Sequence, residues 1–353
     1  MNKAASAAVR RPAGTVCELS LSWPVWGEGM LGTGRTVLRS GPYAFAVLPR
    51  HAVFTPTPDR KAIAQFDWTG KLVRTWRPHA SNDTFSDVIV SGRTLVAGSW
   101  NAPRLHCFDL TTGKDRVVDL EKRQNEADGN AADPAVSAPE ITATGADAPQ
   151  ESNTATVIRL SFDKRHFINA VFRHGTGFAQ TIVSPDLTNI QVSADDFPNG
   201  GIPEPAGKLT YEKLMEAEIE PGQYNVYSEI HSYARGHDTV LDLMLPAPPA
   251  GSVVLAELIG YSSDKCLYFT CLHLADSRHP WSLGLYQLKI GQPRHKLANL
   301  GQPLTLESYR QGNPRRYVVT PNDQVYALVA DHKPTSKKDT CRFRLVSIFA
   351  GSK

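Results

Sequence analysis

The sequence has no run of about twenty apolar residues, which excludes a conventional transmembrane helix. The most apolar candidate, residues 241–260, contains three prolines and two acidic residues. The N-terminal apolar stretch ends at Arg10 and Arg11, too early for a signal-peptide core. We expect a soluble, cytoplasmic chain that makes no membrane contact. A secreted protein whose leader had been removed would look the same.

Cysteine is also scarce, and its distribution argues against a disulfide framework. The five cysteines are odd in number and widely spread. Cys266 and Cys271 are the closest pair, but they lie five positions apart in a segment with strand-like alternation. An odd separation places two strand residues on opposite faces, so these thiols are expected in the core and not around one metal ion.

Dense Lys/Arg runs are absent, and the 38 basic and 35 acidic residues give a net charge of only +3. A nucleic-acid-binding protein usually concentrates basic residues on one face. We therefore expect no nucleic-acid partner.

What the sequence does contain is a repeated phrase. Residues 62–76 read AIAQFDWTGKLVRTW, and residues 104–120 read RLHCFDLTTGKDRVVDL. The two Phe-Asp pairs are 42 positions apart. Each phrase follows two short alternating runs, so each unit contains four strands with a Gly-Lys hairpin between the last two. Related phrases recur at 161–172, 262–272, 282–300 and 320–330, with an irregular unit at 224–247. Residues 208–220 alternate at helical spacing and predict one short helix.

Four-strand units that repeat every 40–50 residues or so are typical of a β-propeller. The segments 66–76, 108–120 and 320–329 resemble blades of the WD40, YVTN and quinoprotein-like propeller superfamily, and the resemblance is clearest over 42–120 and 253–349. The Gly-His and Trp-Asp dipeptides of WD40 repeats are missing as a set, since Asp67-Trp68 has the reverse order.

We predict an all-β propeller of six or seven four-stranded blades. The last unit is one strand short, and residues 15–23 form a strand with no unit of their own. Pairing of 15–23 with 341–349 would close the ring. Residues 1–14 are expected to be a flexible N-terminus before one propeller domain, 15–353. Residues 121–154 have almost no large apolar side chains and are predicted to be a disordered inter-blade insertion.

The segment 26–36, WGEGMLGTGRT, matches the Gly-x-Gly-x-x-Gly pattern and comes close to a phosphate-binding loop. Both motifs require a helix directly afterwards. The residues that follow are strand-like, so we interpret the glycines as a tight loop between strands.

One segment gathers metal-binding side chains. Residues 228–238 contain Glu229, His231, His237 and Asp238, which are candidate metal ligands, and Arg235. His174, in another predicted hairpin, and Arg235 are candidate ligand-binding residues. The propeller resemblance implies that such a site would lie at the mouth of the central channel. An exposed polar loop between strands is the alternative.

Two functions remain open. The first is a non-catalytic propeller, without a cofactor, that binds a protein or a small ligand through loops on one face. The second is a metal-dependent hydrolase or lyase that uses a divalent metal. The first requires no motif, and none is found, so it is favoured. We expect a monomer with a protein partner.

Overall fold

The computed structural model describes residues 14–29, 36–78, 82–120, 156–162, 167–174, 177–184, 187, 190–192, 202–203, 210–220, 223–234, 237–241, 253–261, 266–276, 279–289, 295–301, 317–320, 323–332 and 334–349. Between residues 190 and 301 it describes the strand backbone and only a few side chains. The predicted insertion at 121–154 and residues 1–13 of the predicted flexible N-terminus 1–14 lie outside this part.

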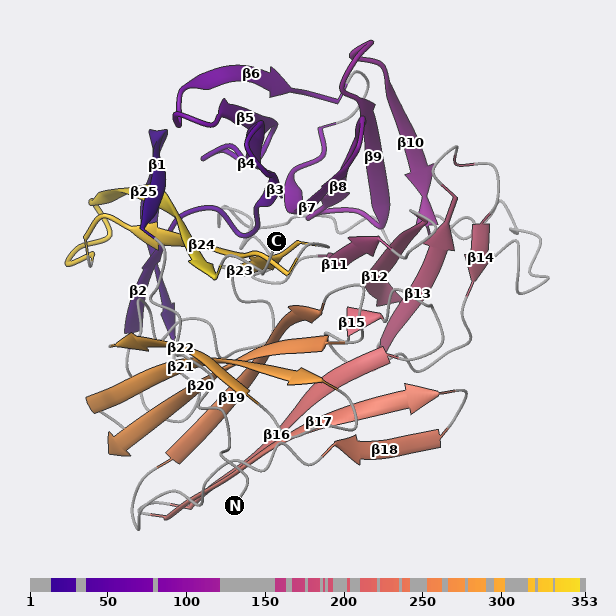
Figure 1. Cartoon of the computed structure of the whole chain (residues 1–353). Helices are drawn as coiled ribbons and strands as arrows, with labels where there is room; N and C mark the ends of the chain where they lie inside the picture. The colour runs from indigo at the N-terminus through magenta and orange to yellow at the C-terminus, as the bar shows by residue number, and fades with distance from the viewer. Residues whose placement is uncertain are drawn as a thin grey trace, which may run out of the picture.

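The described residues form 25 strands, β1 to β25, in antiparallel sheets (Figure 1). Five sheets have four strands each. Their strands are β3–β6 (Ala46–Leu48, Ala52–Pro56, Ile63–Asp67, Leu72–Trp76), β7–β10 (Phe85–Ser91, Thr94–Ser99, Arg104–Asp109, Asp115–Asp119), β11–β14 (Val157–Phe162, Ile168–His174, Gly177–Val183, Ile190–Val192), β15–β18 (Ile202–Pro203, Thr210–Glu220, Gln223–Ala234, His237–Leu241) and β19–β22 (Val253–Tyr261, Cys266–Asp276, His279–Lys289, His295–Gly301). The predicted all-β fold is confirmed.

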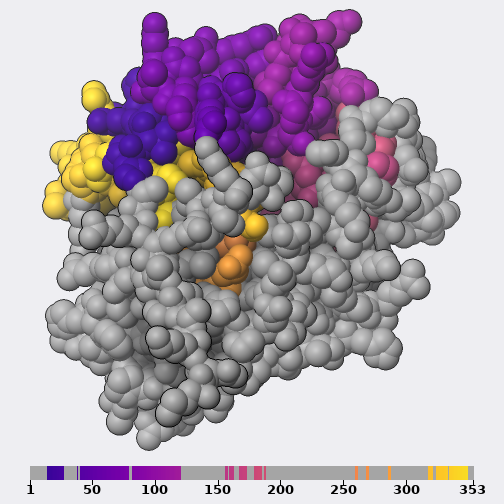
Figure 2. All heavy atoms as spheres, in the orientation of Figure 1, coloured from indigo at the N-terminus to yellow at the C-terminus, as the bar shows by residue number. Residues whose placement is uncertain are grey.

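The sixth sheet joins the two ends of the chain. Its order is β2-β1-β25-β24-β23, with bounds Thr36–Ser40, Thr15–Gly29, Thr340–Phe349, Val325–Ala330 and Tyr317–Val319. The register runs from Thr15 opposite Val346 to Pro24 opposite Thr340, which confirms the predicted strand pairing. In Figure 2 the yellow C-terminal residues lie beside the indigo N-terminal ones. That this pairing closes a ring stays a prediction.

The predicted count of six or seven four-stranded blades is wrong. Five sheets have four strands, and the sheet of the chain ends has five. The reason lies in β1, which was expected to stop near residue 23. It continues to Gly29 and pairs with β2 from Val25 to Gly29. A strand and not a helix follows the glycines of 26–36, as expected, but Gly27 and Gly29 belong to β1 and not to a loop.

The helix predicted at 208–220 is also wrong, because residues 210–220 form strand β16. Tyr211, Met215, Ala217 and Ile219 recur at even spacing as well as on a helical face. All eleven residues of β16 pair with β17. That ladder satisfies backbone groups over the whole segment, and tertiary pairing of this kind overrides a modest helical preference.

The repeated Phe-Asp…Thr-Gly-Lys phrase encodes a turn. Between β5 and β6, Asp67 Oδ1 accepts hydrogen bonds from the Thr69 N–H (2.9 Å) and the Thr69 hydroxyl (2.6 Å), and Gly70 has φ of 87°. Between β9 and β10, Asp109 accepts backbone bonds in the same way, and Gly113 has φ of 77°. Glycine adopts such angles without steric cost. The repeat is therefore structural in origin.

The buried core lies between neighbouring sheets. Four clusters of buried side chains are found among the described residues, and each draws mainly on two adjacent sheets. Typical members are Phe54 with Phe85, Leu105 with Leu160, Tyr268 with Val325, and Phe66 with Leu345. Sheets that pack face to face in chain order are the arrangement expected for propeller blades. Among the described residues, no helix is long and apolar enough to cross a membrane.

Candidate functional site

The predicted metal cluster falls on one hairpin. Glu229 and His231 lie on β17, and His237 and Asp238 lie on β18. The chain folds back on itself there, with His237 opposite Ala234 and Asp238 opposite Tyr233. His231 faces Val240 in the register, so no two predicted ligands are directly opposite each other. Their side chains lie outside the described part of the structure, so their convergence on one ion stays a prediction.

The two predicted ligand-binding residues are equally untested. His174 is the last residue of β12 and is paired with Gly177 across a hairpin, as expected. Its side chain is not described. Arg235 lies outside the described residues.

The best-defined surface feature is built on the turn between β4 and β5. The Thr57 N–H donates to the Ala62 carbonyl and the Arg60 N–H to the Thr57 carbonyl, both at 2.8 Å. The Thr57 hydroxyl donates to Asp59 Oδ1 at 2.6 Å. Within this turn Arg60 has φ of 58°. This φ lies in the left-handed region, where a residue with a side chain is strained by about 1–2 kcal/mol. Such strain tends to occur at functional sites.

Two aromatic rings contact the Arg60 side chain, and a third ring packs on one of them. Its guanidinium carbon lies 4.2 Å from the ring centroid of Tyr43 and 4.2 Å from that of Trp100. Trp26 stacks on Tyr43 at 5.3 Å with an interplanar angle of 19°. We call Trp26, Tyr43, Arg60 and Trp100 the Arg60 cluster. Trp100 is buried, while the other three are half-buried and reach the surface.

The cluster draws on elements far apart in the sequence. Trp26 is in β1, Tyr43 precedes β3, and Trp100 follows β8. The Arg60 carbonyl accepts the Phe85 N–H at 2.8 Å, which ties the β4–β5 turn to the start of β7. The cluster therefore lies where connections of three sheets meet.

Two cations lie near the turn that carries Arg60. Lys61 and Arg77 are exposed, and both act electrostatically on the exposed carboxylate of Asp59. Among these neighbours, the positive charges outnumber the single carboxylate.

A buried ion pair anchors the same end of the β7–β10 sheet. Asp83 Oδ2 lies 2.8 Å from His106 Nε2, and Asp83 Oδ1 lies 3.0 Å from an Arg104 nitrogen. Both Asp83 and His106 are buried, so this carboxylate is shielded from solvent and from any ligand. Phe85 packs edge-on against the His106 ring. The group holds the chain that enters β7 in place and thereby supports the Arg60 cluster.

Sequence reasoning did not identify this site. Its four residues are spread over positions 26–100, and only the fold brings them together. One usable signal exists, because Trp26, Tyr43, Arg60 and Trp100 all stand at or near strand ends. Large aromatic and Arg side chains at such positions are candidates for surface recognition.

Comparisons with known proteins give distant structural likenesses. No family model and no curated protein matches the chain. Among solved structures, a protein from Lactobacillus plantarum has 10% identity and a TM-score of 0.43, covering 91% of this chain and 90% of its own. Virginiamycin B lyase from Staphylococcus aureus has 12% identity and a TM-score of 0.40, covering 86% of this chain and 83% of its own. A chain of the nidogen/laminin complex has 12% identity and a TM-score of 0.41, covering 83% and 92%.

These likenesses are too remote to assign an activity. The fold itself rests on the successive antiparallel sheets, on the cores between them and on the repeated turn. By these features the fold is a β-propeller, and its subfamily is not identified.

Proposed function

We propose that this chain is a non-catalytic propeller that binds an acidic segment of a protein partner at the Arg60 cluster. The observation that carries the proposal is the Arg60 guanidinium, which lies 4.2 Å from two ring centroids at a strained, partly exposed turn.

The chemistry of the cluster supports an interface. Trp, Tyr and Arg are the residue types that dominate the energetics of protein–protein contacts. Stacking on Tyr43 and Trp100 restrains the Arg60 side chain before a partner arrives, so less entropy is lost on binding. A guanidinium donates two parallel hydrogen bonds to a carboxylate, a pairing that a lysine ammonium does not reproduce.

The surrounding charge favours an acidic partner over a basic one. Lys61 and Arg77 add positive charge near Arg60, opposed by Asp59. Such complementarity accelerates association and rejects partners of the wrong sign. Affinity at this surface is expected to fall as ionic strength rises, because exposed charges are screened within about 10 Å at 0.1 M salt.

The test uses a peptide library displayed on phage and selected against the full-length protein. Arg60→Gly removes the guanidinium, and glycine adopts the φ of 58° without strain, so this variant is expected to fold. Arg74→Ala is the matched control, because Arg74 also stacks on a ring, with its guanidinium carbon 3.8 Å from the Trp76 centroid.

We expect the wild type and Arg74→Ala to enrich peptides rich in Asp and Glu, and Arg60→Gly to lose this enrichment. Equal enrichment by Arg60→Gly would contradict the assigned site. Enrichment of basic or purely apolar peptides would contradict the acidic partner.

The metal-dependent hydrolase or lyase remains the alternative. It requires Glu229, His231, His237 and Asp238 to converge on one ion. Comparing the metal content of the wild type with that of His231→Ala separates the two functions. A stoichiometric divalent ion that disappears in His231→Ala would support the alternative.

A further inference from the structure

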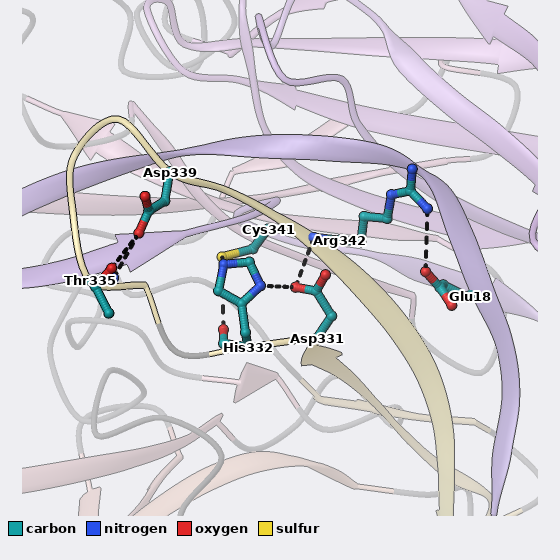
Figure 3. Close-up of polar contacts among 7 residues, drawn as sticks. All are labelled: Glu18, Asp331, His332, Thr335, Asp339, Cys341 and Arg342. Carbon is teal, nitrogen blue, oxygen red and sulfur yellow. Dashed lines mark hydrogen bonds and ion pairs between the residues drawn. The ribbon is translucent and has the colours of Figure 1, made fainter.

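The turn between β24 and β25 brings a carboxylate, an imidazole and a thiol together. Among the described residues, Asp331, His332 and Cys341 form the group of His, Cys, Asp or Glu side chains whose ligand atoms all lie within 4.8 Å of one another. Figure 3 shows the His332 ring between the other two. Its Nδ1 lies 2.8 Å from Asp331 Oδ1, and its Nε2 lies 3.7 Å from Cys341 Sγ.

The neighbours of the His332 ring favour one tautomer of the imidazole. A carboxylate next to Nδ1 favours the tautomer with the proton on Nδ1, so the Nε2 lone pair is directed at Cys341. Asp331 is itself held, because its Oδ1 also accepts the Arg342 backbone N–H at 3.1 Å. A carboxylate–imidazole pair of this kind commonly orients a histidine that ligates zinc.

The spacing of sulfur and nitrogen suits a shared ion. With Zn–S of about 2.3 Å, Zn–N of about 2.0–2.1 Å and a tetrahedral angle, the two donor atoms lie about 3.6 Å apart. The observed separation between Cys341 Sγ and His332 Nε2 is 3.7 Å. Thiolate and neutral imidazole are also the donors that zinc prefers.

The turn that carries the ligands is held by its own hydrogen bonds. Asp339 Oδ2 accepts the N–H (2.8 Å) and hydroxyl (2.9 Å) of Thr335 and the N–H of Ser336 (2.9 Å). The ligands are therefore presented on a restrained turn, which reduces the cost of ordering them around an ion.

Burial favours an ion over a nucleophile at this position. Cys341 has 0% exposure, so its sulfur has no direct path to a carbonyl substrate. The His332 and Asp331 side chains are 47% and 35% exposed, so a small ion can enter from their side. We propose that Cys341 and His332 bind a zinc ion. Asp331 orients the His332 ring, and solvent completes the coordination of the ion. Binding replaces the thiol proton, which passes to solvent, with the metal.

The experiment titrates cobalt(II), a spectroscopic substitute for zinc, into the reduced full-length protein. Ligation by a thiolate gives a sulfur-to-cobalt charge-transfer band in the near ultraviolet. We expect this band to saturate at one equivalent and to disappear when zinc displaces cobalt. Asp331→Asn should weaken binding by about 10- to 100-fold, as loss of such an orienting partner usually does.

Two variants and one control assign the ligands. Cys341→Ser and His332→Ala should both abolish the band, whereas Cys107→Ser, which removes another buried thiol, should keep it. His332 is 47% exposed, so His332→Ala is expected to fold and decides the matter even if Cys341→Ser does not. A wild type without the band, or a band that persists in His332→Ala, would overturn the proposal.

Discussion

Replacing Gly70 with alanine should loosen the contact between the first strand and the β5–β6 turn. Gly70 has φ of 87°, and a Cβ built there would lie 1.8 Å from the Glu18 backbone oxygen. The Gly70 carbonyl accepts the Ser20 N–H at 3.0 Å, and the Leu72 N–H donates to the Ser20 hydroxyl at 3.0 Å. The added Cβ forces either β1 or the turn to move, because the Glu18 oxygen that it meets belongs to the backbone and not to a flexible side chain.

Gly113 provides the matched comparison in the β9–β10 turn. Its φ is 77°, but a Cβ there would meet only the end of the Arg74 side chain, at 2.6 Å, and that side chain can move. Alanine at either glycine costs about 1–2 kcal/mol of backbone strain. Gly70→Ala also loses two hydrogen bonds of about 1 kcal/mol each. We therefore expect Gly70→Ala to be less stable than Gly113→Ala by about 2 kcal/mol.

The assay compares urea midpoints of the two variants and hydrogen exchange of residues 15–24. Gly70→Ala should lower the midpoint more and should accelerate exchange in β1. Gly113→Ala should leave exchange in β1 unchanged. Equal midpoints, with β1 equally protected in both, would refute the packing of the β5–β6 turn against β1.

Three further perturbations test the fold. Trp23→Phe removes the indole N–H bond to the Pro56 carbonyl (3.2 Å) and should lower stability by about 1 kcal/mol, so an unchanged urea midpoint would count against that contact. Burial raises the pKa of Cys107 to about 12, so iodoacetamide at pH 8 should label this thiol only after denaturation, and mass spectrometry of the native protein would reveal an exception. Hydrogen bonds from their own turns lower the pKa of Asp67 and Asp109 below 3.8. Because the pKa values of these two carboxyl groups are lower in the folded state, their contribution to stability is present above the unfolded-state pKa and is lost as the pH falls through the folded-state pKa. The urea midpoint should therefore decrease when the pH is lowered below about 4, and it should stay level if the bonds are absent.

Local chemistry explains what the sequence could predict. Asp67 and Gly70, like Asp109 and Gly113, act within a single turn, so their spacing alone predicted both hairpins. The pairing of the chain ends followed from a missing strand in the last unit and an unassigned one at the start.

The features that could not be predicted depend on distant contacts. Residues 210–220 form a strand because β17 pairs with them, and nothing within the segment decides between helix and strand. The rings of Tyr43 and Trp100 meet at Arg60 only after three sheets have packed.

His332 and Cys341 are a different case, since they lie only nine positions apart. They flank the turn of one hairpin, so their approach follows from the β24–β25 pairing. The sequence favoured the cluster at 229–238 instead, because carboxylates and imidazoles are closer together there, and its convergence on one ion stays a prediction.

The most direct test of the proposed function is a calorimetric titration with one acidic peptide recovered from the display selection. The peptide is titrated into the wild type, Arg74→Ala and Arg60→Gly at low and high salt. Binding at the Arg60 cluster predicts equal affinity for the wild type and Arg74→Ala, at least about tenfold weaker affinity for Arg60→Gly, and weaker binding at high salt. Unchanged affinity in Arg60→Gly would contradict the claim that this cluster is the binding site.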